Sequence, residues 1–72
     1  MAENKSMKLY SLRYAKSHNP VYFDGVSIVC NNISALVFLV EQARETSDSF
    51  SNAMEIVDVE TGRVVMDIEK QK

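Results

Sequence analysis

The segment NNISALVFLVEQARET, from Asn31 to Thr46, decides the fold of this chain because no other stretch has a strong helical repeat. At about 100° per residue its apolar side chains gather on one broad arc, with polar side chains opposite. The apolar arc consists of Ile33, Leu36, Val37, Leu39, Val40 and Ala43. This pattern predicts an amphipathic helix with one face for a core. We expect Asn31 or Asn32 to cap its start, and turn-forming residues to stop it within 45–48.

Phe38 is the exception within this predicted helix, because it projects from the polar arc beside Glu41 and Gln42. A single exposed apolar side chain is ordinary in soluble proteins, and a loop could also cover it. A phenyl ring on a polar helix face would equally suit an anchor for a protein partner. The ordinary interpretation carries more weight, and Phe38 remains a candidate partner-binding residue.

The sequence before the helix has β character. In residues 8–16 the side chains alternate, so that Tyr10, Leu12 and Tyr14 share one face of a half-buried strand. Residues 21–30, VYFDGVSIVC, contain Asp24-Gly25, which is a strong two-residue turn signal. This segment is either a tight hairpin or one longer strand with a bulge at Gly25, and the hairpin is slightly favoured.

The sequence after the helix predicts a second hairpin. A polar loop over 47–52, interrupted by Phe50, leads to two β-rich runs that flank Glu60-Thr61-Gly62. Val57 and Val64 are expected to be neighbours across it, although the register could slip by one residue. Both faces are apolar: Val57, Val59, Val64 and Met66 are expected on one, with Ile56 and Val65 on the other. Such a hairpin is expected to pack against another part of the protein, or another chain, on each of its two faces.

The order of elements is therefore β-β-β-α-β-β. We expect a two-layer α+β domain in which one helix packs on an antiparallel sheet of three to five strands. The domain is predicted to span 8–69, with flexible ends at 1–7 and 70–72. A single domain is the most that 72 residues can form. Its 46% hydrophobic and 25% charged residues are typical of a folded chain that is only marginally stable alone.

Composition and charge indicate the compartment. The net charge of −2 argues against general attraction to nucleic acid or anionic membranes. Cys30 is the only cysteine, which excludes an internal disulfide and fits a reducing compartment. The first residues, MAENKSMK, lack the apolar core of a signal peptide, and the longest apolar run is too short to span a bilayer. We therefore expect a cytoplasmic protein without membrane contact.

No segment carries a catalytic or ligand-binding signature. His18 is the only histidine, and nothing at a recognisable spacing would serve as its catalytic partner. His18 and Cys30 are isolated from other metal ligands, and both glycines lie at turns rather than in a phosphate-binding loop. We therefore expect no enzyme, no metal, no cofactor and no small-molecule substrate.

The N-terminal strand carries aromatic and basic side chains together. Lys8, Tyr10, Tyr14 and Lys16 share one face, with Arg13 opposite. Aromatic side chains among cations can stack nucleobases and hold phosphates, so a nucleic-acid-binding module is the alternative function. The favoured interpretation is that both tyrosines pack their rings under the helix, because the remainder of the chain is acidic.

The sequence favours a small protein–protein interaction module. We expect an accessory regulator or inhibitor of a larger partner, of the kind that bacteriophages carry, or a homodimer. This expectation rests on size, on the missing catalytic set and on the doubly apolar hairpin. The candidate partner-binding residues are Phe38, Ile56 and Val65.

Overall fold

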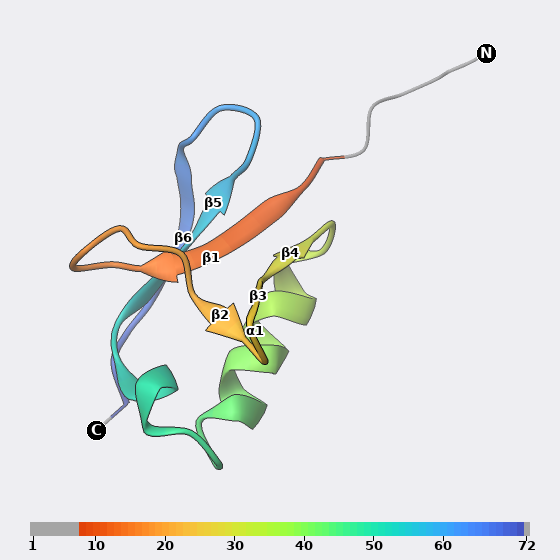
Figure 1. Ribbon diagram of the computed structural model, residues 1–72. Helices are drawn as coiled ribbons and strands as arrows, with labels where there is room; N and C mark the ends of the chain where they lie inside the picture. Colours follow the sequence, from red (N-terminus) through yellow and green to blue (C-terminus); the bar gives the residue numbers. More distant parts are fainter. Residues whose placement is uncertain (1–7, 72) are drawn as a thin grey trace.

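The computed structural model describes residues 8–71, so the predicted flexible segment 1–7 and the last residue lie outside the described part. The elements in chain order are β1 (Tyr10–Tyr14), β2 (Tyr22–Phe23), β3 (Val26–Ser27), β4 (Val29–Cys30), α1 (Ile33–Ala43), the 3-10 helix η1 (Asp48–Ser51), β5 (Met54–Asp58) and β6 (Val64–Ile68). Strands β4-β1-β5-β6 form one antiparallel sheet, and β2 with β3 forms a small second one. Helix α1 packs on the larger sheet, which confirms the predicted two-layer α+β fold (Figure 1).

Strand β1 lies inside the sheet although it comes first in the chain. It pairs with β5 along its whole length, from Tyr10 opposite Asp58 to Tyr14 opposite Met54. Its other edge is covered by two separate segments: Val21 donates to the Leu12 carbonyl, and the Leu12 amide donates to the Ile28 carbonyl. Both backbone groups of Leu12 are therefore paired on that edge, as a buried strand requires.

The six residues between these two segments, 22–27, form the β2–β3 hairpin. Its turn is Asp24-Gly25, and both residues have positive φ, 56° and 82°. Two successive left-handed residues define the turn that matches the twist of a two-residue hairpin. The predicted hairpin is confirmed. The chain leaves β1 at Val21, makes the hairpin and returns to β1 at Ile28, so the hairpin is an excursion from one interrupted strand.

Helix α1 begins as the sequence predicts and ends earlier. The Asn32 side chain accepts a hydrogen bond from the Ala35 amide, which confirms Asn32 as the cap. The helix ends at Ala43, before the predicted 45–48, because the amides of Thr46 and Ser47 both turn back to the Ala43 carbonyl. The Arg44 side chain then donates to three carbonyls: those of Phe50, Asn52 and Glu69. This guanidinium joins the helix end to η1 and to the end of β6.

The core lies between α1 and the sheet. Its buried members are Leu12, Val21, Leu36, Val40, Ala43, Phe50, Met54 and Ile56. Leu36 and Val40 are buried as predicted, whereas Leu39 is only partly buried at the side of the helix. Tyr10 and Tyr14 pack against the same cluster, so β1 turns its aromatic face toward the helix. Phe50, which interrupts the polar loop in the sequence, is buried.

The β5–β6 hairpin has the predicted turn and an unpredicted bulge. Gly62 is left-handed at φ 76°, and Val57 faces Val64, as expected. The pairing then shifts, so that Met66 rather than Val65 faces Ile56. Val65 is the extra residue of this bulge, and two residues of β6 oppose one of β5. The expectation that Met66 shares a face with Val64 is therefore wrong, because the bulge reverses the alternation after Val64.

Truncation of the helix face tests this core. Leu36→Ala is expected to lower the free energy of unfolding by about 2–5 kcal/mol, because it removes buried methyl groups and leaves a cavity. Phe38→Ala is the control on the same helix, since the Phe38 side chain is 62% exposed and should change the free energy little. Urea unfolding followed by circular dichroism measures both. Equal effects of the two substitutions would contradict the assigned helix face.

Candidate functional site

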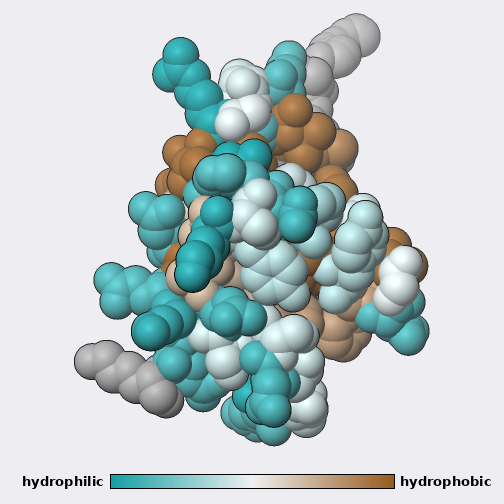
Figure 2. All heavy atoms as spheres, turned by 60° about the vertical axis from the view of Figure 1, so that its left-hand side comes forward, coloured by the Kyte–Doolittle hydropathy of each residue, from teal (hydrophilic) through white to brown (hydrophobic). Residues whose placement is uncertain are grey.

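The sheet face opposite α1 carries a row of exposed apolar side chains. Val64, Val57, Ser11 and Val29 stand opposite one another across the four strands, and Val57 is buried among its neighbours. Five side chains make up the exposed part, which we call the sheet-face patch: Leu9, Val29, Val59, Val64 and Val65, each between 42% and 51% exposed. Figure 2 shows hydrophobic side chains gathered in the upper part of the molecule, at the level of the β5–β6 hairpin in Figure 1.

A buried carboxylate lies beside this patch on the same face. Glu55 of β5 stands directly opposite Arg13 of β1, and only 7% of its side chain is exposed. The Arg13 Nε donates to Glu55 Oε2, and His18 Nδ1 lies 2.9 Å from the same oxygen. His18 reaches it from a loop in which its own φ is +63°, a left-handed conformation that a residue with a Cβ adopts at some cost. The carboxylate therefore holds both β1 and the loop.

The hydrogen bonds determine the charge state of Glu55. Burial raises the pKa of this carboxyl, but the hydrogen bonds from His18 and Arg13 outweigh it and hold the pKa below its usual value. Glu55 is accordingly negatively charged near neutral pH, and its carboxylate is hydrogen-bonded to Arg13 and His18. Arg13 is committed to this contact.

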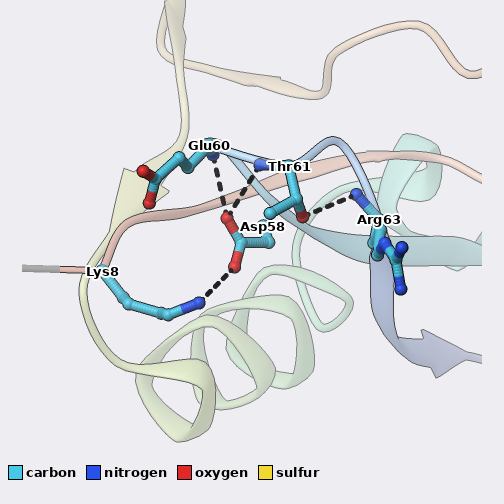
Figure 3. A network of polar contacts seen from close by, with 5 residues as sticks. All are labelled: Lys8, Asp58, Glu60, Thr61 and Arg63. Atoms are coloured by element: carbon cyan, nitrogen blue, oxygen red, sulfur yellow. Dashed lines mark hydrogen bonds and ion pairs between the residues drawn. The ribbon is translucent and has the colours of Figure 1, made fainter.

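A second buried carboxylate, Asp58, organises the turn of the β5–β6 hairpin (Figure 3). One oxygen accepts from the amides of Glu60 and Thr61, and the other accepts from Lys8 Nζ at 3.0 Å. The hydrogen bond from Lys8 is the main reason why the pKa of Asp58 lies below its usual range, and the same contact raises the pKa of Lys8. Asp58 thus ties the beginning of the described chain to the hairpin turn.

These contacts account for most of the aromatic and basic set that the sequence places on the N-terminal strand. Lys8 pairs with Asp58, and Arg13 pairs with Glu55 on the other face. Tyr10 and Tyr14 are half-buried against the core beneath α1. Lys16 is exposed in the loop that follows β1. The structure does not bring the five side chains together on one open surface.

The three candidate partner-binding residues lie in three different places. Phe38 is exposed on α1, on the layer away from the sheet-face patch. Val65 is exposed at the bulge of β6, at the edge of that patch. Ile56 is fully buried in the core, so the expectation that a partner could reach it needs correction. Ile56 faces α1 because it pairs with Leu12 on the covered side of the sheet.

A hollow of about 400 Å³ lies next to the sheet-face patch. Its lining includes Ser11, Arg13, His18, Tyr22, Val29 and Val59. His18 and Cys30 do not meet there, because Cys30 packs against the core on the helix side. Among residues 8–71, no group of three or more His, Cys, Asp or Glu side chains could hold a metal ion. No helix in the described part of the chain has the length and apolar character needed to cross a membrane.

Sequence reasoning identified part of this surface and missed the rest. The apolar residues of the C-terminal hairpin were recognisable from their alternation. Leu9 and Val29 could not be assigned to the same patch, because their alignment depends on the register of β1 with β5 and β4. The pairing of Glu55 with Arg13 and His18 likewise spans about 40 residues of sequence and has no local signal.

Comparisons of this chain with protein-family models, with curated proteins and with solved structures found no match.

The lowered pKa of Glu55 predicts acid sensitivity of a definite sign. A carboxyl whose pKa is lower in the folded chain binds fewer protons than in the unfolded chain, so its stabilisation is present above the usual pKa of 4.5 and is lost as the pH falls through the folded value. We expect the free energy of unfolding to fall between about pH 5 and pH 3, and to fall less steeply in Glu55→Gln.

Urea unfolding at a series of pH values measures this dependence. Glu69→Gln is the matched control, because Glu69 is exposed and its carboxylate has no ion pair within residues 8–71. Parallel curves for the natural chain and Glu55→Gln would mean that the contacts of Glu55 contribute nothing to the acid response.

Proposed function

We propose that this protein is a small non-enzymatic protein-interaction module that associates with a second copy of itself through the sheet-face patch. The observation that carries the proposal is the exposure of five apolar side chains on one sheet face, opposite the single helix. Contiguous apolar surface of this kind is unusual on a soluble monomer and marks interaction sites. A second copy is the simplest partner, because twofold dimers place the same patch on both sides of the interface.

The edges of the sheet favour face-to-face packing over addition of a strand. Strand β6 is an edge strand, and its bulge at Val65 interrupts the regular row of backbone groups that another strand would need. Bulges of this kind protect edges from pairing with other chains. At the other edge β4 has only two residues, Val29 and Cys30. Two sheets packed through their apolar faces would remove the patch from water while the edges stay unused.

The pairing of the two buried carboxylates, Glu55 and Asp58, favours an interface over the patch. Glu55 is paired with Arg13 and hydrogen-bonded to His18, and Asp58 is paired with Lys8, so neither buried carboxylate lacks a partner. An interface over the patch would therefore not leave either of these two buried carboxylates without a partner, which is the costly case for charged groups, whereas the exposed Asp67 stands opposite Glu55 on the same face. The apolar row would form its centre and the exposed polar side chains its rim.

A charge placed in the patch tests the proposal. Val65→Lys is expected to shift the chain from dimer to monomer in sedimentation velocity at tens of micromolar, on the order of the dissociation constant of a weak dimer. Val26→Lys is the matched control, because Val26 is 65% exposed on the β2–β3 hairpin and lies outside the patch. Circular dichroism of both variants verifies that the fold is kept. A natural chain that stays monomeric under these conditions would contradict the proposal.

Nucleic-acid binding is the competing function, and the positions of the basic side chains weigh against it. Since Lys8 and Arg13 are paired internally, two of the three cations proposed for this surface are not free to hold phosphates. We expect no measurable affinity for labelled single-stranded RNA or DNA in fluorescence anisotropy at physiological salt. A micromolar dissociation constant that Lys16→Glu weakens, with an affinity that falls steeply as salt rises, would reverse this assignment.

A further inference from the structure

A second apolar surface lies on the opposite layer of the molecule, between α1 and the β2–β3 hairpin. It is an open groove of about 400 Å³ lined by Phe23, Ala35, Phe38, Leu39, Gln42, Ala43 and Thr46. Six of these residues lie on α1 or shortly after it, and Phe23 comes from β2. We call this feature the helix–hairpin groove. Two phenyl rings stand at its sides, with Phe38 62% and Phe23 49% exposed.

The walls of this groove are held in place by the core. The Phe23 ring packs edge-on against the buried ring of Phe50, with centroids 6.0 Å apart at 79°. That contact fixes the hairpin against the helix layer. Ala43 is buried and Leu39 is half-buried at the base. The groove is thus a preformed apolar depression between two aromatic side chains, which is the form that pockets for a partner's anchor residue take.

Three acidic residues lie close in the chain to the residues that line the groove. Glu41 and Glu45 lie on α1 or just after it, close to Phe38 in the chain, and Asp24 follows Phe23 at the tip of the hairpin. All three side chains are exposed, and none has an ion-pair partner within the described range 8–71. The nearby cation, Arg44, is directed to backbone carbonyls instead. Three exposed carboxylates thus lie on or next to the two segments that line this apolar depression.

We propose that the helix–hairpin groove binds a basic peptide segment of a partner protein, which inserts one bulky apolar side chain between Phe23 and Phe38. Lysine or arginine side chains on either side of that anchor would face Glu41, Glu45 and Asp24. Charge complementarity of this kind steers association and selects the partner, while the apolar anchor supplies most of the binding energy.

The same charges disfavour other occupants. An anionic lipid or fatty acid would place its own negative group among the three carboxylates. A second copy of this chain carries the same acids, and its Lys8, Arg13 and Arg44 are engaged in internal contacts, which leaves Lys16, Arg63 and Lys70 as the exposed cations of residues 8–71 without an ion pair in that range. The proposal is independent of self-association, because the groove and the sheet-face patch belong to opposite layers.

Selection from a display library of random peptides of about twelve residues, on the immobilised full chain, tests the proposal. We expect enrichment of sequences with a bulky apolar residue flanked by Lys or Arg. Synthetic labelled copies of the enriched peptides are then measured by fluorescence anisotropy. Phe38→Ala should weaken their binding at least about tenfold, and the double substitution Glu41→Lys with Glu45→Lys should do the same.

Two further variants show whether the peptides bind at the groove itself. Glu69→Lys reverses an exposed charge away from the groove and should leave the affinity unchanged. Val65→Lys should abolish self-association and leave peptide binding intact, so failure of one proposal is distinguishable from failure of the other. Circular dichroism confirms that each variant is folded.

Several outcomes would overturn the proposal. The selection could enrich acidic peptides, or it could enrich no peptide at all. The enriched peptides could also bind Phe38→Ala and the natural chain with equal affinity. Loss of dimer in Phe38→Ala during sedimentation would assign the groove to a second copy instead.

Discussion

The structure depends on the need to cover both edges of strand β1. This strand lies inside the sheet, and one edge is taken by β5 along its full length. On the other edge, two segments form backbone hydrogen bonds with β1: Val21 before the β2–β3 hairpin and Ile28 after it. Because Val21 and Ile28 both bond to the backbone of Leu12, the six residues between them have to leave the sheet. The Phe23–Phe50 contact then holds the hairpin near α1, and the helix–hairpin groove lies between them.

The two buried carboxylates of β5 fix how β1 lies against it. Glu55 meets Arg13 on the open face, and Asp58 meets Lys8 at the end of the sheet. A shift of one residue would carry each acid away from its cation and leave a buried charge without a partner, which is strongly unfavourable. The same contacts use the basic side chains that would otherwise make the N-terminal strand a phosphate-binding surface. The same ion pairs thus fix the register of β1 on β5 and engage Lys8 and Arg13.

The β2–β3 hairpin contributes to hollows on both layers. Successive side chains of β2 point in opposite directions, as they do in any strand. Phe23 borders the helix–hairpin groove, and Tyr22 borders the hollow beside the sheet-face patch. A two-residue strand on a tight Asp24-Gly25 turn thereby shapes two separate surfaces. One of them is apolar, and the other combines Val29 and Val59 with Arg13 and His18, which both contact Glu55.

The sequence by itself determined the elements whose signals are local. The period of α1, a cap at Asn31 or Asn32, the turns at Gly25 and Gly62 and the inward face of β1 were all predictable, because each rests on residues a few positions apart. The tertiary structure alone decided the bulge at Val65, the burial of Glu55 and Asp58 and the alignment of Leu9 with Val59. It also decided that Phe38 stands beside a groove rather than in open solvent. These features arise from contacts between residues far apart in the chain, and no local pattern encodes which of them will meet.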